Sequence, residues 1–115
     1  MAHAARRVQV NAWVDEAVAP LVEALNLRAD LVTLDSCQGD DEQDAYVIFA
    51  AVGSDLRAVL ADITRRLSGL TVRGVPVRVR LDQNLTEGTE IAELIVPLNT
   101  IREVAEALSG SVPAV

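Results

Sequence analysis

The chain has 115 residues, of which 50% are hydrophobic and 23% are charged, and its formal net charge is −7 at pH 7. This length and composition predict a single folded domain over residues 1–115, with frayed ends at about 1–6 and 111–115. No apolar run approaches the ~20 residues of a membrane helix, and no apolar segment follows Arg6 and Arg7 as it would in a signal peptide. We therefore expect a cytoplasmic protein without a membrane partner.

The charged and aromatic residues argue against a nucleic-acid partner. Seventeen acidic residues stand against ten basic ones, all of which are arginines. Proteins bind phosphate backbones mainly by neutralising them with cations, and an acidic chain disfavours this. The aromatic residues are Trp13, Tyr46 and Phe49, which are too few for a platform that stacks single-stranded bases.

The chain has one cysteine, Cys37, and one histidine, His3, and this small number excludes several kinds of site. A single cysteine excludes an intramolecular disulfide, and the two residues are too few for a Cys/His zinc site, which needs three or four ligands. A catalytic Cys–His pair would depend on His3, close to the start of the chain. We therefore expect no metal and no cofactor, and we favour a non-enzymatic role over catalysis.

Three segments have the apolar spacing of amphipathic helices. In the first, over residues 14–26, Pro20 lacks a backbone donor and predicts a kink or a helix that restarts there. The second begins behind the N-cap residue Ser54 and stops at Gly69. The third begins near the segment Thr100–Glu103, which matches a capping box.

Four segments have strand length, and they show two kinds of pattern. Alternation of apolar and polar residues is typical of a strand buried on one face, whereas a continuous apolar run is typical of a central strand. Residues 31–37 and 77–82 alternate, and residues 45–50 and 91–96 are mostly continuous apolar runs. The alternating segments are therefore the expected edge strands.

The elements follow the order α-β-β-α-β-β-α, which predicts an α+β fold arranged as a two-layer α/β sandwich. Moving the first strand of a ferredoxin-like β-α-β-β-α-β unit to its end gives this order, because its first and last strands are antiparallel neighbours. The expectation is a permuted ferredoxin-like, four-stranded sheet with 45–50 and 91–96 in its centre. Right-handed crossovers place the first two helices on one face, and the last helix either extends that layer or covers the other face.

The densest group of chemically useful residues lies where the strand 31–37 ends. The candidate ligand-binding residues are Asp35, Ser36, Cys37, Gln38 and Gly39. A glycine in this turn allows a positive φ, so that backbone N–H groups can point toward a ligand. A tight turn that only leaves the strand is the simpler interpretation, and a ligand-binding turn is the alternative. Acidic neighbours disfavour the thiolate of Cys37, so we expect no nucleophilic cysteine.

The remaining charged groups also have a simpler interpretation than a binding site. The acidic segment 40–44 could offer cation ligands together with Asp35, but its spacing does not match an EF-hand and favours a solvated loop. Arg78 and Arg80 lie on one face of an edge strand, where they could bind an anion or pair with Asp35 or Glu93 across the sheet. We favour the pairing.

The first helix and the turn after the first strand carry Val14-Asp15-Glu16, Pro20-Leu21-Val22, Asn26 and Thr33-Leu34-Asp35-Ser36-Cys37-Gln38-Gly39. This segment resembles the N-terminal part of the wybutosine-synthesising tRNA methyltransferase family, in which Ser-Cys-Ser-Gly-Arg follows a comparable helix. Gln38 replaces the second serine of that signature, and Asp40 replaces its arginine. The resemblance implies S-adenosylmethionine as methyl donor and a guanosine of tRNA as substrate. The same turn also looks like that of small uncharacterised bacterial and phage proteins.

We therefore favour a small non-enzymatic protein that binds a protein or small-molecule partner and self-associates as a homodimer. The alternative is a tRNA-modifying, methyltransferase-like protein that depends on S-adenosylmethionine. No metal is expected under either hypothesis, and the methyl donor is the only cofactor, under the alternative alone.

The expected homodimer would use the sheet face that the helices leave open. The central strands have apolar residues in both registers, so this face should combine an apolar centre with a charged rim, as interfaces do. On the edge strands, we expect Val32, Leu34, Val77, Val79 and Leu81 toward the helices, and Thr33, Asp35, Cys37, Arg78, Arg80 and Asp82 toward the open face.

Overall fold

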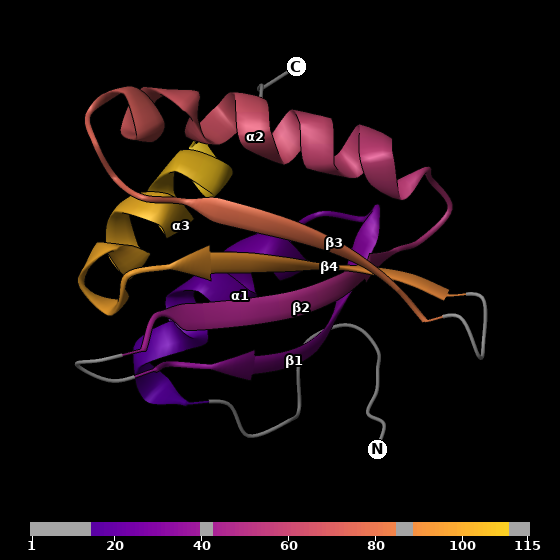
Figure 1. Ribbon diagram of the computed structural model, residues 1–115, viewed down its shortest axis with the longest axis horizontal. Helices are drawn as coiled ribbons and strands as arrows, with labels where there is room; N and C mark the ends of the chain where they lie inside the picture. The colour runs from indigo at the N-terminus through magenta and orange to yellow at the C-terminus, as the bar shows by residue number, and fades with distance from the viewer. Residues whose placement is uncertain (1–14, 40–42, 85–88, 111–115) are drawn as a thin grey trace.

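The computed structural model describes residues 15–39, 43–84 and 89–110, and within these ranges it confirms the expected α+β class. Short 3-10 turns precede the first and last helices (Figure 1). In chain order the elements are a 3-10 turn (Glu16–Val18), α1 (Ala19–Asn26), β1 (Leu31–Cys37), β2 (Ala45–Ala51), α2 (Leu56–Val72), β3 (Arg78–Asn84), β4 (Thr89–Val96), a second 3-10 turn (Leu98–Thr100) and α3 (Ile101–Gly110).

The four described strands form one antiparallel sheet in the order β1-β2-β4-β3. This is the order expected of the permuted ferredoxin-like arrangement. The two apolar strands β2 and β4 are central, and the two alternating strands β1 and β3 are the edges. The division between apolar and alternating segments therefore predicted each strand's place in the sheet.

All three helices lie on one face of this sheet. The core combines the apolar sides of α1, α2 and α3 with alternate residues of the strands, including Val47, Phe49 and Leu94, which have no exposed surface. Because α3 packs against both α1 and α2, it extends the helix layer, which was one of its two expected positions. The other face of the sheet is not covered by any described helix (Figure 1). No helix in these ranges is long and apolar enough to cross a membrane.

A β-bulge in β1 contradicts part of the expected sorting of side chains. Thr33 pairs with the core residue Phe49 and lies on the helix side, where its hydroxyl donates to Asn26 Oδ1 at 3.2 Å. Val32, its neighbour, therefore faces the opposite way, and Leu34 at the irregularity is 55% exposed. The expected directions of these three side chains are wrong because a bulge interrupts the alternation from which they were predicted.

The starts and ends of the helices agree with the predictions in part. Pro20 lies in the first turn of α1, directly after a 3-10 turn, so the helix restarts there as predicted. The N-cap of α2 is Asp55 and not Ser54, because the Asp55 carboxylate accepts from the Arg57 amide at 3.1 Å. The predicted stop at Gly69 is also wrong, since α2 continues to Val72.

A network of charged side chains fastens the α1–β1 connection to α2. The Asp62 carboxylate accepts from Arg28 Nη1 and from Arg66 Nε, both at 2.7 Å, and also from Arg65. Arg28 forms a second, bidentate pair with Asp30 at 2.7–2.8 Å. Hydrogen bonds from Arg66 and Arg28 hold the pKa of Asp62 well below its usual range.

Replacing Asp62 with asparagine should lower the free energy of unfolding by about 2 kcal/mol, because it removes the shared acceptor of partly buried guanidinium groups. A carboxylate with a lowered pKa contributes its full stabilisation above the ordinary value of about 4, and this is lost as the pH falls through the lowered value. The difference between wild type and Asp62→Asn in urea unfolding should therefore shrink below about pH 4. A difference that stays constant on acidification would contradict the assignment, and the exposed Glu106→Gln serves as control.

Candidate functional site

The turn after β1 is connected to the start of the first helical segment. The Gln38 amide donates to Asp15 Oδ2 at 3.0 Å, and Gln38 Oε1 accepts from the Ala17 amide at 3.2 Å. The side chain of Gln38 thus provides an acceptor for an N–H group at a helix start, which has no partner within the helix. This reciprocal pairing explains why a glutamine at this position is structurally useful.

The five candidate residues of this turn do not converge on one point. Ser36 pairs with the core residue Val47 and lies on the helix side, whereas Asp35 and Cys37 face the opposite side of the sheet. Gly39 adopts the predicted positive φ of 74°, and its amide donates to Cys37 Sγ at 3.5 Å. The backbone amides of Gln38 and Gly39 therefore already donate within the chain, which leaves them without a free hydrogen for a ligand at this turn.

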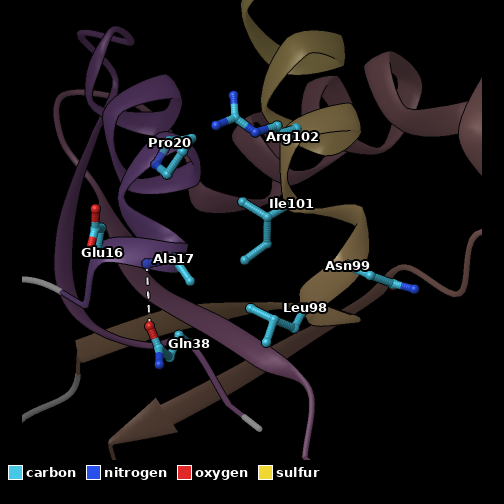
Figure 2. A pocket seen from close by; sticks show the side chains of 8 residues that line it. All are labelled: Glu16, Ala17, Pro20, Gln38, Leu98, Asn99, Ile101 and Arg102. Atoms are coloured by element: carbon cyan, nitrogen blue, oxygen red, sulfur yellow. Dashed lines mark hydrogen bonds between the residues drawn. The ribbon is translucent and has the colours of Figure 1, made fainter. Parts of the chain in front are cut away.

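A shallow pocket of about 530 Å³ lies beside Gln38, at the end of the sheet where α1 and α3 both begin (Figure 2). Its wall is apolar where Pro20 and Ile101 contribute, and it carries charges from the exposed side chains of Glu16 and Arg102. The lining residues are Glu16, Ala17, Pro20, Gln38, Leu98, Asn99, Ile101 and Arg102. Of the five candidates, only Gln38 lines it.

Sequence reasoning did not predict the contribution of the segment 98–102 to this pocket. The predicted strand order did contain an indication of this pocket. It places the end of β1, the end of β4 and the starts of α1 and α3 at the same end of the sheet. Proximity across so many elements depends on the angles between helices, which local sequence patterns do not determine.

The second candidate site is the open face, defined as the side of the sheet opposite the helices. Because Val47 and Leu94 are fully buried on the helix side, their neighbours along β2 and β4 point the other way. The open face consists of Val32, Asp35, Cys37, Tyr46, Ile48, Ala50, Arg78, Arg80, Asp82, Ile91, Glu93 and Ile95. Val32 lies there in place of the expected Thr33, and the other edge residues, Asp35, Cys37, Arg78, Arg80 and Asp82, match those expected.

The antiparallel registers align these side chains in rows that cross all four strands. The registers of the three strand pairs give a middle row of Asp35, Ile48, Glu93 and Arg80, and a neighbouring row of Cys37, Tyr46, Ile95 and Arg78. Both of these rows begin with a residue of β1 and end with an arginine of β3, whereas Asp82, which pairs with Ile91, follows on the same edge strand. The open face therefore differs in charge between its two edges.

The central strands of the open face carry mainly apolar side chains, with Glu93 as the charged exception, and its edge strands are mainly polar. Tyr46, Ile48 and Ile91 are partly buried, and Ile95 is only 7% exposed although it lies outside the helix-side core. Burial, the largest cause, and the negative charge of Asp35 raise the pKa of the Tyr46 hydroxyl. Both effects disfavour the charged, deprotonated form of this side chain.

Arginine side chains on the rim form exposed ion pairs. Arg80 lies 3.4 Å from Glu93, as expected from the sequence, and Arg78 lies 3.0 Å from Asp44. The expected pairing with Asp35 does not occur, and Asp35 forms no ion pair among the residues that the structure describes. Both arginines are more than 60% exposed, so these pairs are weak and can exchange partners.

The described residues contain no group of three His, Cys, Asp or Glu side chains that could hold a metal ion. Some residues considered in the sequence analysis lie outside the described ranges, namely His3, Trp13, Asp40, Asp41 and Glu42. The acidic segment 40–44, for which a solvated loop is the favoured interpretation and a cation site the alternative, is therefore described only at Gln43 and Asp44.

No protein-family model matches the chain, and comparisons with curated proteins and with solved structures gave no match. The resemblance of residues 14–39 to the wybutosine-synthesising family therefore stays a prediction.

Gly39→Ala should lower the free energy of unfolding by about 1–3 kcal/mol, because an alanine there is strained and its Cβ would overlap the Gln43 carbonyl. Gly69→Ala is the matched control: its Cβ meets open space within α2, and it should raise the free energy of unfolding by about 0.5–1 kcal/mol. Urea unfolding measures both. Equal effects of the two substitutions would show that the turn is not constrained as described.

Proposed function

We propose that this protein is a non-enzymatic binding module that forms a homodimer through the open face. The observation that supports the proposal is the mainly apolar centre of that face, where Tyr46, Ile48, Ile91 and Ile95 lie on the two central strands around Glu93, with charged residues on the edge strands. The proposal includes a cytoplasmic location, a homodimer as the main assembly, and neither nucleic acid nor membrane as partner.

The reason for association is the burial of apolar surface. An apolar centre surrounded by polar residues is typical of protein interfaces. Among soluble oligomers, the twofold dimer is the most common closed assembly. The helix layer already buries the apolar sides of α1, α2 and α3. The open face is the part of the sheet that remains for a second molecule.

Ile48→Arg should make the protein monomeric, because it places a charge in the apolar centre without disturbing the helix-side core. Val72→Arg is the matched control, since Val72 is 86% exposed at the end of α2, and it should leave the dimer unchanged. Light scattering over a concentration series measures the mass, with 12.3 kDa for one chain. A wild-type protein of that mass at all concentrations would refute the homodimer.

A second candidate function is the binding of a small ligand in the pocket. The observation that favours it is that Gln38, a candidate ligand residue, lines the pocket together with the charged side chains of Glu16 and Arg102 (Figure 2). The methyltransferase-like alternative belongs to this class, with S-adenosylmethionine as ligand.

Calorimetric titration with S-adenosylmethionine distinguishes the two functions. We expect no saturable binding, because the amides of Gln38 and Gly39 already donate within the chain. Binding that is lost in Gln38→Ala and Arg102→Ala, and retained in the control Arg57→Ala on α2, would contradict the non-enzymatic proposal and favour the alternative.

A further inference from the structure

The two edges of the open face carry opposite charges at the same height along the strands. Asp35 on β1 and Arg80 on β3 occupy the two ends of the middle row, with Ile48 and Glu93 between them. Asp35 forms no ion pair within the described residues, and its carboxylate accepts only a local hydrogen bond from the Ser36 amide at 2.8 Å. Figure 1 shows β1 and β3 at opposite edges of the sheet.

We propose that two copies of the chain pack face to face about a twofold axis that runs parallel to the strands, between β2 and β4. This inference rests on the proposed homodimer and names its geometry. Such an axis exchanges the two edges, so that β1 of one copy lies over β3 of the second copy. Asp35 then meets Arg80 of the second copy, and symmetry repeats this contact at the other edge.

Charge favours this axis over one that runs perpendicular to the strands. A twofold axis perpendicular to the strands and through the middle row would lay each strand over its own counterpart. Asp35 would then approach Asp35, and Arg80 would approach Arg80, which places like charges opposite one another. The axis parallel to the strands replaces both repulsive contacts with attractive ones.

In the middle row the same axis places Ile48 of one copy over Glu93 of the second, and the neighbouring row supplies the apolar contact. In the neighbouring row Tyr46 and Ile95 occupy the two central strands, so the axis between β2 and β4 places Tyr46 of one copy over Ile95 of the second. This contact also occurs twice. Packed sheets are rotated by about 30° relative to each other, so the opposing rows cross near the axis and the long rim side chains span the offset.

The availability of Arg80 supports its role in the contact. Its side chain is 63% exposed, and its guanidinium lies 3.4 Å from the Glu93 carboxylate, a pairing that stabilises little. A second carboxylate can therefore approach the same guanidinium from the facing copy. Arg80 would be shared between Glu93 of its own chain and Asp35 of the second copy, which fixes the register of the two sheets.

Charge reversal at the two positions tests the geometry. Asp35→Arg, Arg80→Asp and the double variant are compared with wild type by sedimentation equilibrium, with circular dichroism as a check on folding. Each single variant creates two like-charge contacts and should weaken the dimer by about tenfold or more. The double variant exchanges the two charges and should restore the wild-type dissociation constant, and an equal mixture of the single variants should form the heterodimer.

Each result has a distinct meaning. The axis parallel to the strands is supported if the single variants dimerise weakly, the double variant regains the wild-type dissociation constant, and the mixture forms a heterodimer. Single variants that dimerise as well as wild type overturn this axis and leave the homodimer intact. A double variant as weak as the single ones overturns the contact between Asp35 and Arg80. A monomeric wild type overturns the proposed function itself, and the inference with it.

Discussion

The helix-facing side chains of β2 and β4 pack beneath all three helices, and the rest of the structure depends on this packing. Val47, Phe49 and Leu94 lose all of their exposed surface there. Because α1, α2 and α3 are all used on this side, the chain concentrates its core in a single layer. The same packing produces the open face, since no described helix remains to cover it. The placement of all three helices on one face therefore both forms the core and leaves the opposite face available as a candidate interface.

The residue types in the turn after β1 suggest a ligand-binding site, but their hydrogen bonds stabilise the fold. Gln38 and Gly39 use their amides inside the chain, and Gln38 also provides an acceptor at the start of the first helical segment. These bonds join the end of β1 to residues that precede α1. The residues of the motif that project outward, Asp35 and Cys37, belong instead to the open face.

Much of the fold was predictable because strand and helix periodicities are strong local signals. The apolar run 45–50 and the restart at Pro20 are examples, since each follows from residues that are adjacent in sequence. The bulge at Leu34 was not predictable, because Val32 and Leu34 alternate as they would in a regular strand. The end of α2 was misplaced because Gly69 is tolerated on an exposed helix surface, whereas Gly74 adopts the positive φ of 97° after the helix. The pocket was missed because its walls meet only in three dimensions.

The order of the strands has a consequence for the speed of folding. The pairs β1–β2 and β3–β4 join segments that are close in the chain, whereas β2 and β4 pair across the whole of α2 and β3. Closing that long loop costs entropy before any central contact can compensate for it. Two local hairpins can consequently form early, and the docking of Val47 against Leu94, with the helices collapsing over them, becomes the slow step.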